Sequence, residues 1–446
     1  MPSDTPPPGG RGEKLGLFRD SALIVLARIG GAVSALGFTM LLSRTMGSEG
    51  LGHVSVAISL AMVLALFCTT NIEAGGVRFM VRYIADGDWG KTRAFIRFST
   101  RYVLAMSAAT LVVVLAYKRL VNGTWPELHI LIGIVAAPLL AQMRLGAGFA
   151  MGLSRPVIAT LPRTFLRPAV FLAAVALWIA VTGTIAPLSA MVLFLVTIAL
   201  VLLGQTIVVR GLLNRALADD SVSDMSDART WLKISLTLGL SVMYVEYSVY
   251  VAVLAGSLVL EPSQLALLDV SLKIMALLKF GVTAINQVFM PKLSRAMAQD
   301  DQAALANWLA ISGLMKLGVV VVALVAAFLL GRPVLGLFGE EFRAAYSLLL
   351  LLLLDPVCIA VFGPASNVVS FSKRPYALLP PLAAGLTVLI GGTALFGATW
   401  GLWGAGLAYV LARVCWLAWL AGYCIVKLGI NPTIFSVFAW AKQRKG

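Results

Sequence analysis

The chain has 446 residues, of which 60% are hydrophobic and 12% are charged, so it carries about half the charge of an ordinary soluble domain. Long apolar runs rich in Leu, Ala, Val and Gly favour membrane-spanning helices and exclude a transmembrane barrel of short alternating strands. The net charge of +15 does not indicate a nucleic-acid partner, because the bases gather at predicted cytoplasmic ends, where anionic membrane lipids are the expected partners.

The first 14 residues are rich in Pro and Gly and predict a disordered cytoplasmic tail rather than a cleavable signal peptide. After this tail the chain has room for about twelve apolar helices of ~20 residues, the length that crosses a bilayer. We therefore predict an all-α polytopic membrane protein with transmembrane helices at residues 21–42, 53–75, 102–117, 128–150, 161–182, 185–209, 232–254, 263–290, 304–330, 344–369, 377–398 and 401–426.

The loops between these spans alternate in basic charge. The 76–101 loop carries six bases, whereas the only charge in the 255–262 loop is Glu261. Because loops rich in Lys and Arg stay on the cytoplasmic side, the alternation predicts that both termini are cytoplasmic.

A polar linker at residues 213–230 divides the chain into two halves of six spans, at residues 15–212 and 231–430. A basic cytoplasmic tail follows at residues 431–446. Six is an even number, so both halves enter the membrane from the same side. The division predicts a parallel pseudo-repeat around a central cavity.

Two echoes in the sequence support the repeat. The residues from Phe79-Met80 and from Phe289-Met290 each leave an apolar segment, cross a basic turn and reach an acidic pair before a helical pattern. Arg155-Pro156 and Arg374-Pro375 each follow the fourth span of a half.

The chain has little material for catalysis. Its four cysteines lie in apolar runs without metal-ligand spacing, and its two histidines are far apart in the sequence. No loop between the spans is long enough for a soluble catalytic domain. We expect a protein that is not an enzyme and that uses no metal or cofactor.

Charged residues inside the spans are costly, about 2.5–3.5 kcal/mol each at the bilayer centre, and usually face a bundle interior or an aqueous cavity. The bases in the predicted spans outnumber the acids, which suits an anionic substrate better than a cationic drug. The bases are Arg28, Arg144, Lys273, Lys279, Lys316 and Arg413, and the acids are Glu73, Glu246, Asp269 and Asp355.

Arg28 lies about two turns into the first span, and Gly31, Ala32 and Ala35 follow it on one helix face. Such a face can pack closely or line a cavity. One interpretation is that Arg28 binds an anionic headgroup, and the alternative is that it snorkels toward the cytoplasm.

Other charges in the spans are interpreted in the same way. Arg144 and Lys316 are candidate cavity bases. Asp269 and Lys273 are four residues apart and can form a structural ion pair along one helix face, or Lys273 can serve as a further cavity base.

Two acids are candidates for ion coupling. Glu246 could neutralise a cavity base or carry a proton. Asp355 precedes Pro356 in mid-span, which indicates a structural kink or, because proline frees a backbone carbonyl, a hinge or cation site.

The loop after the first span reads MGSEGLGH (Met46–His53), and Val81–Ala85 reads VRYIA. These motifs resemble the polysaccharide flippases, which are the oligosaccharidyl-lipid flippase family of the multidrug/oligosaccharidyl-lipid/polysaccharide exporter superfamily. Gly47, Glu49 and Gly52 match the loop of that family, whereas Ser48 and Gly50 depart from it.

The resemblance implies a bacterial inner-membrane flippase. Such a protein moves undecaprenyl-diphosphate-linked oligosaccharide units to the periplasmic face, by alternating access, for O-antigen, capsule or exopolysaccharide synthesis. The resemblance also implies glycosyltransferases and a polysaccharide polymerase as neighbours, and transport driven by the membrane potential or a coupled ion.

The resemblance further implies a cationic cavity, in which the headgroup phosphate would meet Arg28, Arg144, Lys273 and Lys316. Arg28 matches, by position only, a first-helix arginine of the related lipid II flippases, which usually have fourteen helices.

The alternative is a multidrug and toxin extrusion antiporter, which shares the architecture and needs an acidic cation site such as Glu246 or Asp355. A membrane polymerase or glycosyltransferase is a third class. Proteins of that class normally carry a large outer loop with acids, which this sequence lacks.

Overall fold

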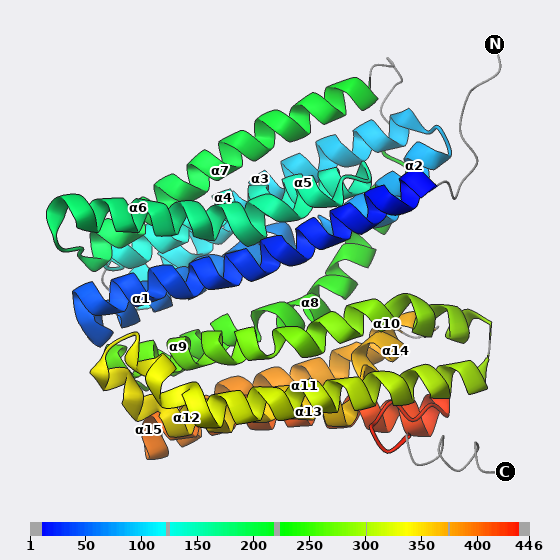
Figure 1. The fold of residues 1–446 in the computed structure, drawn as a ribbon. Coiled ribbons are helices and arrows are strands. Elements are labelled where there is room, and N and C mark those ends of the chain that lie inside the picture. The colour runs from blue at the N-terminus through cyan, green and yellow to red at the C-terminus, as the bar shows by residue number, and fades with distance from the viewer. Residues whose placement is uncertain (1–10, 122–124, 218–223, 300, 373–374, 437–446) are drawn as a thin grey trace. The chain divides into compact units, whose positions relative to one another are not determined.

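The computed structural model describes residues 11–121, 125–217, 224–299, 301–372 and 375–436. The described residues are almost entirely helical and include no β-strand (Figure 1). The contacts divide the chain into two compact units: unit 1 comprises residues 1–41 and 60–239, and unit 2 comprises residues 42–59 and 240–446.

Unit 1 is built from helices that follow one another along the chain. They are the first and last parts of α1 (Arg11–Thr69), up to Leu41 and from Leu60, the π-helix η1 (Gly76–Met80), α2 (Val81–Ala85), α3 (Trp89–Val121), α4 (Leu128–Gly152), α5 (Pro156–Leu161), the π-helix η2 (Pro162–Leu166), α6 (Arg167–Thr182), α7 (Pro187–Ala216) and the start of α8 (Ala228–Gly256).

Unit 2 contains the remainder of α8, residues 42–59 of α1 and the later helices. These are α9 (Pro262–Leu278), α10 (Phe280–Ala298), α11 (Gln302–Gly336), the 3-10 helix η3 (Glu340–Ala345), α12 (Tyr346–Leu352), α13 (Leu354–Phe362), α14 (Ala365–Phe371), the 3-10 helix η4 (Pro375–Leu378) and α15 (Leu379–Leu428).

Eight helical segments of the described chain are long and apolar enough to cross a membrane. Two of them, Arg19–Thr69 with 51 residues and Leu379–Leu428 with 50, are each long enough for two crossings. The other predicted spans lie on α8 and on the pair α9 and α10. The prediction of an all-α polytopic membrane protein is therefore confirmed.

Glycines mark the change of direction inside both long helices. Gly47 in α1 has a φ of 70°, and Gly401 in α15 has a φ of 58°. These angles lie in the left-handed region, which glycine adopts without the steric cost of a side chain. Gly47 falls in the loop predicted between the first two spans, so the glycine of the MGSEGLGH motif makes that turn. Gly401 is the first residue of the last predicted span, directly after the short loop predicted at residues 399–400.

The sequence echo that begins at Phe79 and Phe289 has a structural counterpart. The Asp88 Oδ1 atom accepts a hydrogen bond of 3.0 Å from the Lys91 amide at the start of α3. The Asp301 Oδ1 atom accepts one of 2.8 Å from the Ala304 amide at the start of α11. In both places an aspartate caps the helix that follows the basic turn.

The end of the predicted linker packs into unit 1. The Trp231 indole donates to the Tyr83 hydroxyl at 3.0 Å, and that hydroxyl donates to Asp227 at 2.7 Å. Burial raises the pKa of Tyr83 to about 12, so the phenol remains a donor at neutral pH. The boundary between the units lies inside α8, after Gly239, and the predicted boundaries of the two halves remain a prediction.

The predicted topology can be tested by thiol labelling in a variant that lacks the four native cysteines. Thr184→Cys and Ser257→Cys replace exposed residues in predicted outer loops, and Ser226→Cys replaces an exposed residue of the predicted cytoplasmic linker. We expect an impermeant maleimide to label the first two in intact cells and the third only after the membrane is opened. Labelling of Ser226→Cys in intact cells would reverse the topology.

Candidate functional site

Unit 1 holds a buried ion pair beside a break in a helix. α1 ends at Thr69, and Thr70 and Asn71 follow with positive φ angles of 45° and 65°. Glu73 comes directly after this break and receives a hydrogen bond of 2.7 Å from Nε of Arg144 on α4. The side chains of Arg144 and Glu73 are 5% and 12% exposed, respectively. Irregular backbone is tolerated at membrane depth where it is buried in protein or lines a cavity.

Close backbone packing holds η1 against α4 at this pair. A Cβ atom on Gly76 would overlap the carbonyl of Gly148, and a Cβ on Gly148 would overlap the backbone of Glu73. The ion pair of Glu73 and Arg144 therefore lies where the backbone near η1 and the backbone of α4 are in direct contact at glycines.

Several buried polar atoms of unit 1 have no hydrogen-bond partner among the described residues, including Asn71 Nδ2, Glu73 Oε2 and Gln142 Nε2. Buried polar groups are normally paired, but atoms of this kind also occur in unit 2, for example Asn286 Oδ1 and Lys316 Nζ, so they do not by themselves locate a binding site.

Unit 2 holds a cluster of one acid and two bases. Asp355 on α13 is completely buried. Its Oδ1 accepts from Nε of Arg413 on α15 at 2.6 Å, and its Oδ2 accepts from Nζ of Lys279, between α9 and α10, at 2.7 Å. The Arg413 guanidinium also lies 5.6 Å from the centre of the Tyr244 ring. With these groups ionised, the cluster has a formal charge of +1.

The pairing predicted along α9 is confirmed. Lys273 Nζ lies 2.7 Å from Asp269 Oδ2, and the Ser55 hydroxyl donates to the same oxygen at 2.6 Å. Ser55 belongs to the part of α1 that lies in unit 2, and Gly52 on the same segment packs against the Pro262 carbonyl at the start of α9. The ion pair lies within α9, and the hydrogen bond from Ser55 to Asp269 joins α9 to α1.

The other predicted site residues lie in different surroundings. Arg28 is half-buried on α1, and Gly31 on its predicted small face packs directly on the Thr164 carbonyl of η2. Lys316 on α11 is completely buried, and its Nζ has no hydrogen-bond partner among the described residues. Glu246 is exposed on α8. The roles of these residues in substrate binding or ion coupling remain predictions.

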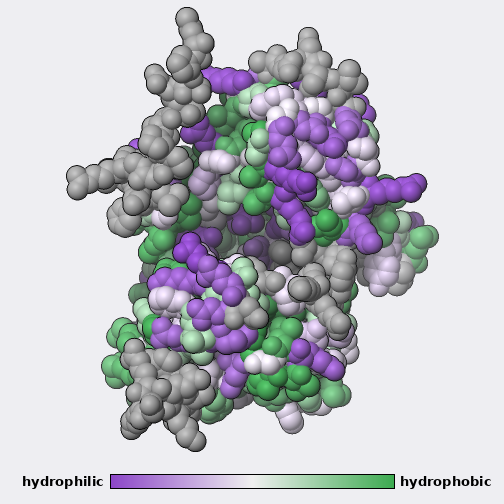
Figure 2. All heavy atoms as spheres, turned by 90° about the vertical axis from the view of Figure 1, so that its right-hand side faces the viewer, coloured by the Kyte–Doolittle hydropathy of each residue, from purple (hydrophilic) through white to green (hydrophobic). Residues whose placement is uncertain are grey.

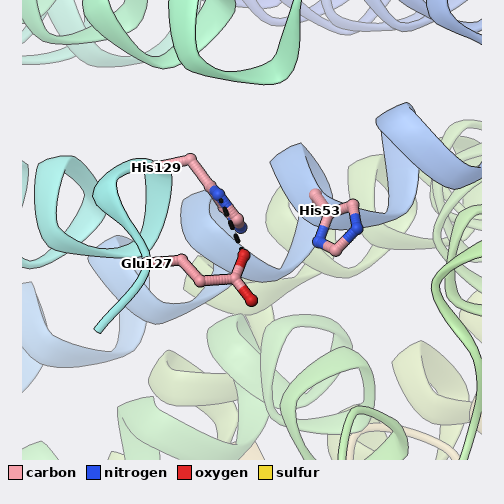
Figure 3. A group of neighbouring side chains, drawn as sticks. All are labelled: His53, Glu127 and His129. Atoms are coloured by element: carbon pink, nitrogen blue, oxygen red, sulfur yellow. Dashed lines mark ion pairs between the residues drawn. The ribbon is translucent and has the colours of Figure 1, made fainter. Parts of the chain in front are cut away.

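A further polar pair lies at the start of α4. His129 Nδ1 lies 3.4 Å from an Oε atom of Glu127, whose side chain is exposed (Figure 3). His53, also drawn in Figure 3, is a residue of unit 2. We infer no metal site from residues that belong to both units.

No protein-family model matches the chain, and no curated protein matches its sequence. Solved structures do match. An inward-facing multidrug resistance MATE family transporter of the MOP superfamily aligns over 93% of this chain and 96% of its own, with a TM-score of 0.73 and 13% identity. The lipid II flippase MurJ in an inward closed conformation aligns over 94% and 91%, with a TM-score of 0.71 and 12% identity.

The chain has the fold of these transporters. A third match supports the same conclusion: the MATE multidrug transporter DinF-BH aligns over 93% of this chain and 96% of its own, with a TM-score of 0.65 and 15% identity. At this identity the likeness establishes the fold alone. The predicted fold is confirmed, while the predicted membership of the exporter superfamily and the narrower resemblance to polysaccharide flippases belong to the proposal below.

Proposed function

We propose that the protein is a flippase that moves undecaprenyl-diphosphate-linked oligosaccharide units across the bacterial inner membrane for the synthesis of a surface polysaccharide. The observation that carries this proposal is how the charged residues of the predicted spans are paired. Three of the four acids, Glu73, Asp269 and Asp355, are each bound to at least one base. The bases named in the predicted spans still outnumber the acids, which favours a substrate that carries negative charge.

The chemistry of a diphosphate headgroup suits this excess of bases. Arginine binds phosphate through two parallel N–H groups and stays protonated under all physiological conditions. Arg28 is the base proposed to contact the headgroup first, because it is half-buried rather than enclosed. An inside-negative membrane potential would favour outward movement of an anion by about 2.3 kcal/mol per charge per 100 mV.

A multidrug antiporter is the second candidate, since transporters of that class share the fold. A cation-coupled antiporter needs a carboxylate that can exchange its ion. Asp355 is poorly suited to this role, because both of its oxygens accept hydrogen bonds from bases. Glu246, which is exposed on α8, is the better candidate for such a site.

Complementation distinguishes the two functions. The flippase proposal predicts that the wild-type chain restores surface glycan in a strain lacking its own oligosaccharide flippase and confers no resistance to cationic drugs. Glu246→Gln should then retain glycan export, measured per amount of protein in the membrane. Drug resistance that is lost in Glu246→Gln, without any restoration of glycan, would instead establish the antiporter.

A further inference from the structure

α3 and α7 leave a groove between them in unit 1. Both helices pack against α4, and a cavity of about 350 Å³ opens between the start of α3 and the end of α7. Arg93, Arg97 and Arg210 line this cavity together with apolar residues. No acid lies among its described lining residues. The cavity therefore combines concentrated positive charge with an apolar wall.

A second cavity continues along α3. It has a volume of about 410 Å³, shares Arg97 with the first, and is also lined by Arg101 and Tyr102. Arg93, Arg97 and Arg101 are spaced four residues apart, so their side chains lie along one face of the helix. The Arg93 guanidinium is held at the end of α7, where it donates to the Leu217 carbonyl at 3.1 Å.

Beyond the arginines the same helix becomes apolar and exposed. Leu104, Val112 and Val113 on α3 are all more than half exposed, as expected for a helix that faces lipid. The arginines lie in the 76–101 loop and the first turns of α3, on the predicted cytoplasmic side. Figure 2 views the molecule from the side on which α2 lies in Figure 1, and hydrophilic side chains gather on this face. A ligand of this groove would thus meet charge at the membrane surface and apolar side chains deeper in.

We propose that the groove between α3 and α7 binds the headgroup of an anionic glycerophospholipid from the cytoplasmic leaflet. The phosphate would lie among Arg93, Arg97 and Arg210, and the acyl chains would follow the apolar part of α3. Basic pockets between transmembrane helices on this side of a membrane bind anionic headgroups, whereas a soluble phosphate would gain nothing from the apolar surface below. This site is separate from the transport function proposed above and does not depend on it.

The test is a binding titration of the purified full-length protein in neutral detergent, with fluorescent phosphatidylglycerol and phosphatidylcholine of the same chain length. Wild-type protein is expected to prefer phosphatidylglycerol by about a hundredfold, the sum of three basic contacts. The variant with Arg93→Gln, Arg97→Gln and Arg210→Gln should lose most of this preference while keeping its abundance and melting temperature.

A matched control removes the same number of charges elsewhere. Arg155, Arg229 and Arg295 are exposed and lie outside both cavities, so their replacement by Gln should leave the preference unchanged. Equal loss in both variants would overturn the proposal in favour of general surface charge. Displacement of the lipid by inorganic phosphate at similar concentration would overturn it in favour of a soluble anion, and tighter binding of a polyprenyl diphosphate would overturn it in favour of the transported lipid.

Discussion

Asp355→Asn is expected to destabilise unit 2 by about 3–5 kcal/mol, the cost of breaking a buried ion pair by removing one partner. Asp355 accepts from both Lys279 and Arg413 at 2.6–2.7 Å. The substitution keeps the size of the side chain but leaves two bases together without a counter-charge. The formal charge of the cluster rises from +1 to +2. We expect a lower melting temperature in detergent and less protein in the membrane.

The same reasoning predicts an order among variants. Arg413→Met leaves the neutral pair of Asp355 and Lys279 and replaces the guanidinium with an apolar side chain, so it should destabilise less than Asp355→Asn. Glu340→Gln is a matched control in unit 2, because Glu340 pairs with Arg343 at the surface, where both side chains are more than half exposed. Surface pairs contribute about 0–1 kcal/mol. If Asp355→Asn melts at the wild-type temperature but loses transport, the cluster is a functional site rather than a structural one.

The sequence predicted the helices well because lipid permits few alternatives. A chain segment in hydrocarbon must satisfy its own backbone, so about 20 apolar residues in succession become a helix. The breaks within the predicted spans were harder to predict from the sequence. The predicted span at residues 263–290 is divided at Lys279 into α9 and α10, and the span at 344–369 is divided into α12, α13 and part of α14. Apolar composition continues across the break at Lys279 and does not reveal it. The break between α12 and α13 lies beside Asp355 and Pro356, where the sequence indicated a structural kink.

The pairing of charges was predictable only where it is local. Asp269 and Lys273 are four residues apart, and their spacing alone predicts the contact. Asp355 is 76 residues from Lys279 and 58 from Arg413, and Glu73 is 71 from Arg144. The sequence identified these residues as costly charges, but only the packing of α4, α13 and α15 selects their partners. A charged residue inside a membrane span can therefore be identified from the sequence more readily than its role can be assigned.

Arg28→Ala is expected to weaken binding of a lipid-linked oligosaccharide about ten- to a hundredfold, which corresponds to the loss of a charge-assisted hydrogen bond of roughly 1.5–3 kcal/mol. The prediction rests on the proposed function and on the half-buried position of Arg28 in α1. Arg28→Lys should restore only part of the binding, because an ammonium group cannot make the planar, two-pronged contact of a guanidinium with phosphate. The measurement is glycan export in a flippase-deficient strain, normalised to the amount of protein in the membrane.

Arg19→Ala is the matched control, since Arg19 lies on the same helix, is exposed and pairs with Asp20 at 3.7 Å. It should export glycan at the wild-type rate. Removing an intramembrane charge lowers the cost of insertion, so a loss of export in Arg28→Ala at normal abundance would be a loss of binding or transport rather than of folding. If Arg28 only snorkels toward the membrane surface, the Ala and Lys variants would both export normally. Full export by Arg28→Ala would therefore remove this residue from the substrate site and leave the headgroup to other bases of the spans.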